Sequence, residues 1–181
     1  MEIDNETKLK LYLLIIHRYK SLISEKESQS ITEIRQRCSP YSEPVKKLKE
    51  RLIGSVINYA YETDFLHATE SALDYIRELK NIQLGLTFWL NFEDIDMLKA
   101  APSFDKCLLL AALLRSFGSE NVRVVETKSK KNYVLFEWSS EKYAILPETG
   151  SLLAGEDVGK LFQNDSIAYS FNDLIYENYE E

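Results

Sequence analysis

The distribution of apolar and polar residues along this chain is most extreme between Pro102 and Gly118. The residues from Cys107 to Leu114 are all apolar, so a helix over this stretch is apolar on every face. Such a helix has to be buried on all sides. The run is far shorter than the roughly 20 residues that cross a bilayer. The stretch therefore predicts a central core helix.

Both ends of this stretch carry residues that start and stop helices. Ser103 is expected to cap the start by accepting from a free backbone N–H, and Asp105 suits the positive end of the helix dipole. Arg115 falls in the last turn and Gly118 lies just beyond it, where helices commonly end. Because backbone donors at the Ser103 end are unpaired, we expect any activity to lie there.

The first helix of the chain is expected to begin after Asp4 or Asn5 and to run to about Ser24. Its apolar residues recur at spacings of three and four, as in an amphipathic helix. Additional apolar residues widen that face, which indicates contact on two sides, with other helices or with another copy of the chain. The apolar positions are Leu9, Leu11, Tyr12, Leu13, Leu14, Ile15, Ile16, Tyr19 and Ile23.

Two more helices are predicted next. Ser30 and Glu33 have the spacing of a capping box, so a short helix should start there. Pro40 and Pro44 predict a turn, because the residue before a proline avoids the helical region. Helical spacing then returns from Pro44 to about Tyr61.

The helical pattern continues beyond this point. Thr69 is expected to cap a helix from Glu70 to about Leu84, and Asn91 a short helix that runs through Leu98. Before position 85 the chain has a single glycine, Gly54. We therefore predict a helical region over residues 1–84.

After Gly118 the chain becomes rich in β-branched and aromatic residues. Strands are predicted at Asn121–Thr127, Asn132–Ser139 and Lys142–Leu146. Their connections have hairpin length, so the three strands should be antiparallel neighbours. Pro147–Gly150 has the composition of a turn.

The end of the chain is predicted to hold a short helix near residues 157–162, a strand near residues 167–171 and an acidic aromatic tail. The tail aromatics either dock on the body, which is the default expectation, or are presented to a partner. The predicted fold class is α+β. A helical region precedes a core over residues 85–181, in which the central helix packs on a small antiparallel sheet. Both parts are also compatible with one compact domain.

Charge and cysteine content exclude several classes of function. The net charge of −7 argues against a general nucleic-acid or anionic-membrane surface. Cys38 and Cys107 form neither a disulfide framework nor a Cys-x-x-Cys pair, so we expect no metal site and a reduced, cytoplasmic protein. The acidic start lacks the basic segment of a signal peptide. Gly155 to Lys160 is one residue short of a phosphate loop, and we expect no cofactor.

Residues between positions 89 and 150 fall together at the spacing of a known family pattern. They are Trp89, Asp105, Lys106, Leu109, Leu110, Leu113, Leu114, Arg115, Gly118, Arg123, Val124, Val125, Leu146 and Thr149. This third of the chain resembles the transglutaminase-like family, which has the papain-like cysteine protease fold. The resemblance implies a buried helix whose start carries the nucleophile, followed by antiparallel strands.

The same resemblance places the catalytic cysteine, histidine and aspartate of the family at Ser103, Asn132 and Pro147. Serine needs a base to take its proton, asparagine cannot be that base, and proline cannot orient one, so these positions are silent for acyl transfer. The resemblance thus implies a catalytically inactive protein that binds a peptide or protein segment. We expect the binding residues to be Ser103, Asp105, Asn132 and Tyr133.

Two other functions remain open at this point. A rewired hydrolase would use Cys107 or Ser103 as nucleophile and His17 or His67 as base. The more ordinary interpretation is a buried structural cysteine and two surface or packing histidines. A helical scaffold would instead self-associate through the first half of the chain.

Overall fold

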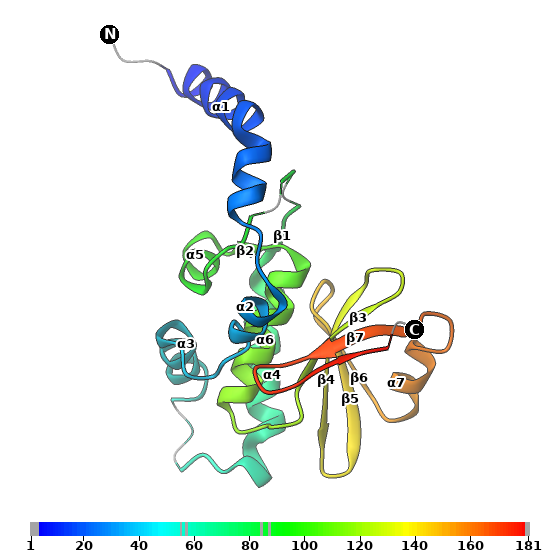
Figure 1. Cartoon of the computed structure of the whole chain (residues 1–181). Coiled ribbons are helices and arrows are strands. Elements are labelled where there is room, and N and C mark those ends of the chain that lie inside the picture. The colour runs from blue at the N-terminus through cyan, green and yellow to red at the C-terminus, as the bar shows by residue number, and fades with distance from the viewer. Residues whose placement is uncertain (1–3, 55, 57, 84, 87, 180–181) are drawn as a thin grey trace.

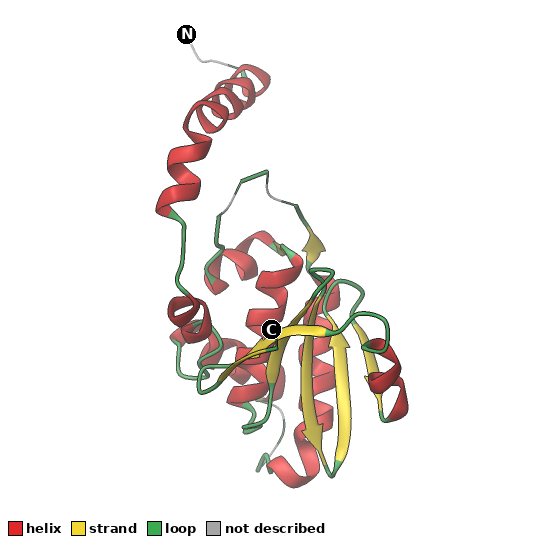
Figure 2. Cartoon of the chain, turned by 45° about the vertical axis from the view of Figure 1, so that its right-hand side comes forward, coloured by secondary structure: helices red, strands yellow, loops and turns green. Residues whose placement is uncertain are grey.

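The computed structural model describes residues 4–54, 56, 58–83, 85, 86 and 88–179. Helices make up the first half of the chain and strands most of the second half (Figures 1 and 2). The first half holds α1 (Asn5–Lys26), α2 (Ile31–Gln36), α3 (Glu43–Ile53) and α4 (Tyr61–Glu78). Next come β1 (Lys80–Asn81), α5 (Phe92–Leu98), β2 (Ala100–Ala101) and α6 (Ser103–Ser116). The remainder is β3 (Arg123–Thr127), β4 (Asn132–Trp138), β5 (Glu141–Leu146), β6 (Ser151–Ala154), α7 (Glu156–Leu161), β7 (Ile167–Phe171) and β8 (Tyr176–Asn178).

Within the described residues, the strands of the second half form one antiparallel sheet in the order β6-β5-β4-β3-β7-β8. Helix α6 packs against β3 and β4, and α3 and α4 pack against α6. This arrangement confirms the predicted α+β class and the antiparallel order of the three predicted strands. The predicted turn follows β5, and α7 and β7 lie within a residue or so of their predicted places.

The central helix α6 is buried as its sequence predicts. Every residue from Asp105 to Leu114 is buried, and those from Cys107 to Leu114 have no exposed surface. Two residues after the helix ends at Ser116, Gly118 adopts the positive φ of 111° that the expected helix end requires. The all-apolar pattern therefore identified the core element correctly.

One hydrophobic core contains residues from both the helical half and the sheet. Phe65 of α4 shows how the halves join. Its ring lies 4.9 Å from the ring of Tyr61 and 5.5 Å, edge-on, from the ring of Phe136 in β4. The apolar faces on either side of position 84 are therefore packed against one another.

Helix α1 forms over the predicted residues and begins at the predicted place, because Asp4 accepts a hydrogen bond from the Thr7 N–H at 2.9 Å. None of its residues is buried. Figures 1 and 2 both show α1 leading away from the rest of the molecule. No helix in the described part of the chain is long and apolar enough to cross a membrane.

Helix α3 ends earlier than predicted. The helical spacing predicts one helix from Pro44 to about Tyr61, but α3 stops at Ile53. Asn58 has a φ of 59°, in the left-handed region that an α-helix cannot contain. Residues 55 and 57 of the predicted helix lie outside the described residues. The apolar residues that continued the spacing belong to the connection to α4.

The predicted helix start at Thr69 is wrong, because Thr69 lies in the middle of α4. Its hydroxyl donates to the carbonyl of Phe65, one turn earlier, at 2.8 Å. A threonine whose hydroxyl bonds to the preceding turn is tolerated inside a helix and need not cap one. The helix also ends at Glu78, before the predicted end at Leu84, which lies outside the described residues.

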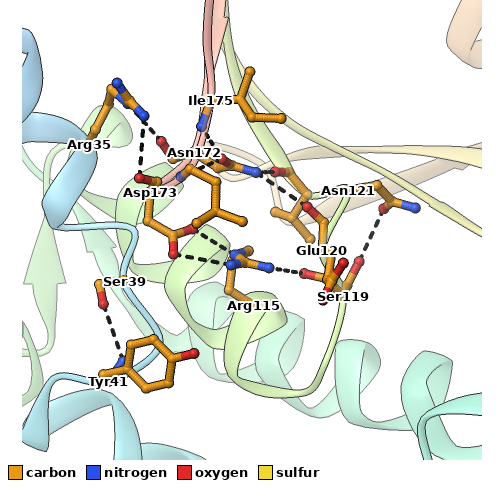
Figure 3. A network of polar contacts seen from close by, with 12 residues as sticks. Arg35, Ser39, Tyr41, Arg115, Ser119, Glu120, Asn121, Asn172, Asp173 and Ile175 are labelled. Carbon is orange, nitrogen blue, oxygen red and sulfur yellow. Dashed lines mark hydrogen bonds and ion pairs between the residues drawn. The ribbon is translucent and has the colours of Figure 1, made fainter.

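A buried ion pair holds the C-terminal segment on the body (Figure 3). The guanidinium of Arg115, at the end of α6, donates to both carboxylate oxygens of Asp173, at 2.6 and 3.1 Å. Both side chains are at most 10% exposed. Arg35 of α2 donates to the carbonyls of Asn172 and Asp173, at 3.0 and 3.3 Å. The tail is thus tied to the first and the second half at once.

Asn172 completes this attachment. Its Nδ2 donates to the Val122 carbonyl at 2.8 Å, and its Oδ1 accepts from the backbone N–H of Leu174 and Ile175, at 2.8 Å each (Figure 3). These bonds turn the chain from β7 into β8, which pairs antiparallel with β7. The backbone of the tail therefore pairs with the sheet edge, as expected from docking, while the side chains of Tyr176 and Tyr179 stay 40% and 48% exposed.

Candidate functional site

The start of α6 differs from the prediction in one respect. Pro102, with φ −60° and ψ 153°, is the N-cap, and its carbonyl accepts from the Lys106 N–H at 3.1 Å. Ser103 is the first helical residue, and no side chain caps the helix. The predicted cap at Ser103 is therefore wrong by one residue. Proline suits this position, because its fixed φ is compatible with the start of a helix and it has no N–H that would be left unpaired.

The sheet brings Asn132 and Pro147 to the same end of one strand pair. Strands β4 and β5 are antiparallel, and their pairing ends at this side with Val134 and Ile145. Asn132 is the first residue of β4, and Pro147 opens the turn after β5 ends at Leu146. Because side chains alternate along a strand, Asn132 shares the face of Val134, which is packed in the core.

The turn at Pro147 also lies beside the start of α6. Asn81 of β1 donates through Nδ2 to the carbonyl of Glu148, at 2.8 Å. Strand β1 pairs in parallel with β2, and α6 begins two residues after β2 ends. The structure therefore brings the positions of Ser103, Asn132 and Pro147 to one end of the core, although they are far apart in the sequence.

The carboxamide of Asn132 has an unusual environment. Its Oδ1 is buried and has no hydrogen-bond partner among the described residues. Glu126 lies directly across the ladder from it, and its carboxylate is 12% exposed and paired with Lys130 at 2.9 Å. A buried acceptor without a donor lowers the stability of the folded state by about 1–3 kcal/mol. The unpaired Oδ1 of Asn132 therefore needs an explanation.

Tyr133 points away from this site. It is absent from the core that contains its neighbours Val134 and Phe136, and its ring meets that of Phe162, after α7, edge-on at 5.5 Å. Burial raises the pKa of its phenol. Tyr133 was expected to line one cleft with Ser103 and Asn132, but strand alternation places it on the opposite face of the sheet.

Asp105, in the first turn of α6, is buried instead of facing an open cleft. One carboxylate oxygen lies 3.4 Å from the Leu90 N–H, and the other lies 3.8 Å from Nη2 of Arg37. Burial raises the pKa of this carboxyl to about 6, because the nearby Arg37 and the Leu90 amide offset the loss of water only in part. Asp105 thus anchors the segment before α5 to the start of α6.

We expect Asp105→Asn to stabilise the protein at neutral pH. The carboxyl holds its proton more tightly in the folded state, with a pKa of about 6, than at its ordinary value of 3.8. The stability that the Asp105 carboxyl contributes to the folded state is therefore fully present at pH values below its ordinary pKa, and it is lost as the pH rises through about 6. Asparagine does not ionise. The free energy of unfolding of the variant, relative to that of the wild type, should therefore rise by about 2 kcal/mol as the pH passes through this range.

Urea unfolding at about pH 4 and about pH 7 measures this difference. The measured difference is smaller than the full shift in pKa implies, because the carboxyl of the unfolded chain, with its ordinary pKa of 3.8, is already partly ionised at about pH 4. A difference between the two proteins that is the same at both pH values would contradict the assignment of the titration to Asp105.

Arg37 joins this cluster to a small cavity that sequence reasoning missed. The guanidinium lies over the rings of Trp89 and Phe92, at 5.4 and 5.6 Å, and donates to the carbonyl of Leu90. Beside it is a cavity of about 230 Å³, smaller than the roughly 300–1,000 Å³ of most small-molecule pockets. Its lining residues are Gln36, Arg37, Ser42, Pro44, Asn91, Phe92 and Glu93. These residues come from separate elements, so no local spacing in the sequence predicts that they meet.

Glu126 was also missed, although a signal for it was present. Once the hairpin between Thr127 and Asn132 is predicted, its register places a residue of the first strand across from Asn132.

Neither cysteine is placed for nucleophilic chemistry. Cys38 and Cys107 have no exposed surface, and burial raises the pKa of both thiols. His17 and His67 lie on the exposed faces of α1 and α4. A fully buried thiol and an exposed imidazole do not form a nucleophile–base pair.

The described residues contain no group of three or more His, Cys, Asp or Glu side chains that could hold a metal ion.

Comparisons of the chain with family models, with curated proteins and with solved structures gave no match.

Proposed function

We propose that this chain is a non-catalytic transglutaminase-like protein that binds an extended peptide or protein segment at the start of α6. The proposal rests on the sequence pattern of residues 89–150 and on the position of three residues at one end of the core. According to the resemblance, Ser103, Asn132 and Pro147 take the places of the family's nucleophile, base and orienting acid.

These side chains do not support acyl transfer. A serine hydroxyl at a helix start gains little from the dipole and needs a base, which a carboxamide cannot supply. Cys107 lies one turn further into the helix and is fully buried, where a thiolate is disfavoured. Binding without turnover is therefore the function that fits this chemistry.

The observation that carries the proposal is the unpartnered Oδ1 of Asn132. A carboxamide oxygen accepts a hydrogen bond from a peptide N–H, and an extended segment offers such a donor at every residue except proline. Because this oxygen is buried in the free chain, the segment has to displace the side chains that cover it before it donates to Oδ1 of Asn132 and covers the start of α6 near Ser103. An unsatisfied acceptor is thereby paired on binding, which favours a ligand with an N–H over one without.

A peptide library displayed on phage, selected against the full chain, tests binding. Peptides so obtained should bind Asn132→Ala about 3- to 10-fold more weakly, the value of one hydrogen bond. The matched control is Asn164→Ala, which removes an exposed carboxamide after α7, on the side of Phe162. Equal losses in both variants, or none in Asn132→Ala, would refute the assigned acceptor.

Turnover assays test the other half of the proposal. We expect no hydrolysis of peptide substrates, no transfer of a primary amine to peptide glutamine, and no labelling of Cys107 by a thiol-directed probe before unfolding. Activity that is lost in Cys107→Ala or Ser103→Ala would show that the protein is an enzyme.

A further inference from the structure

Helix α1 carries a large apolar surface that the rest of the described chain does not cover. Nine of its apolar side chains are between 42% and 58% exposed. They are Leu9, Leu11, Tyr12, Leu13, Leu14, Ile15, Ile16, Tyr19 and Leu22. At 22 residues the helix is about 33 Å long, enough to form an interface along its length. Apolar surface of this extent marks an interaction site.

The charge of α1 is opposite to that of the remaining chain. The helix has five basic residues and two acidic ones, a net charge of +3, while the full chain carries −7. The remaining residues therefore carry −10. The net charge of the whole molecule opposes its approach to an anionic surface.

A regular repeat runs through the apolar residues of α1. Leu9, Tyr12, Ile16, Tyr19 and Ile23 follow at alternating spacings of three and four, the a and d positions of a heptad. In this frame Glu6, Leu13 and Lys20 are e positions, and Lys8, Ile15 and Leu22 are g positions. Such a seam needs a second helix to cover it.

We propose that α1 pairs with α1 of a second copy in antiparallel orientation. The pair is centred near Leu14, so Leu9 lies against Tyr19 of the second copy and Tyr12 against Ile16 of the second copy. Leu13 meets its own counterpart on one flank, and Ile15 meets its own on the other. Because α1 extends from the body, the two bodies lie at opposite ends of the pair (Figure 1).

Charge complementarity selects the antiparallel orientation. With the helices so placed, Glu6 of each copy faces Lys20 of the other, which gives two oppositely charged pairs. A parallel pair would place Lys8 against Leu13, and Ile15 against Lys20, with no opposite charges across the seam. Within its own helix Glu6 accepts from Lys10 at 2.6 Å, on the exposed surface, and the antiparallel register gives Glu6 a second basic partner on the other copy.

Sedimentation velocity of the full chain at micromolar concentrations tests the pairing, and a dimer is expected. Lys20→Glu places like charges at both ends of the seam, so the dissociation constant should rise roughly ten-fold or more. The double variant Glu6→Lys with Lys20→Glu should restore it. The control Arg18→Glu makes the same change of charge on the opposite face of the helix and should leave the dimer intact. Failure of the double variant to rescue would refute the charge pairing.

Disulfide trapping tests the orientation independently of affinity. Leu13→Cys should form a dimer on oxidation, since the two positions meet across the pair, whereas Tyr12→Cys should not. The native cysteines are fully buried and do not interfere. A disulfide through position 12 instead of position 13 would establish a parallel pair and refute the proposal.

A monomer at all concentrations would also refute the proposal, as would binding of α1 to vesicles of anionic phospholipid in place of dimerisation. These outcomes leave the peptide site untouched, because α1 contributes no residue to it. Binding of peptide at Asn132 and pairing of α1 can therefore fail separately.

Discussion

Replacement of Asp173 by alanine is expected to lower the free energy of unfolding by about 3–5 kcal/mol, because it leaves the buried charge of Arg115 without a partner. Both side chains of this pair are at most 10% exposed, and the guanidinium donates to both carboxylate oxygens. Hydrogen bonding to Asp173 raises the pKa of Arg115 in the wild type, and the guanidinium stays charged in the variant because the ordinary pKa of arginine already lies far above neutral pH. The tail should therefore be released or the protein unfolded.

Denaturant unfolding of Asp173→Ala beside Asp157→Ala measures this effect. Asp157 pairs with Lys160 at 2.7 Å, but both side chains are 62% exposed, so its loss should cost less than about 1 kcal/mol. The double variant Arg115→Met with Asp173→Leu should recover much of the stability, since it removes both charges together. Equal effects of the two single variants would mean that the tail is not held by this pair.

Phe65→Ala is expected to lower the free energy of unfolding by about 3–5 kcal/mol and to destabilise the helices and the sheet together. The ring has no exposed surface and lies between Tyr61 of α4 and Phe136 of β4. Its removal leaves a cavity where the helical half contacts the sheet. One cooperative transition, seen equally by helical circular dichroism and by tryptophan fluorescence, is the expected result.

This variant also tests whether residues 1–84 and 85–181 are separate folding units. The matched control is Phe88→Ala, whose side chain is 42% exposed and should cost little. Two separate transitions in Phe65→Ala, with the sheet unfolding at the same denaturant concentration as in wild type, would contradict a shared core.

Local patterns in the sequence determined most elements of this fold. The apolar run of α6, the repeat of α1, the capping box of Ser30 and Glu33, and the hairpin-length connections of β3, β4 and β5 were all predicted and are present. Each depends on residues within a few positions of one another, so propensity and periodicity suffice to find it. Thr69 was misplaced because a hydroxyl serves equally well at a helix start and inside a helix.

Only the tertiary structure decided which side chains meet. Arg115 and Asp173, 58 residues apart, form the buried pair, and Arg37 reaches Asp105 across a comparable separation. Tyr133 and Asn132 are adjacent in sequence yet face opposite sides of the sheet, because the strand alternates and its register decides which face is buried. The sequence by itself determined a buried helix with a sheet beside it, since those depend on local periodicity. The candidate site depends on long-range register and burial, which no local pattern encodes.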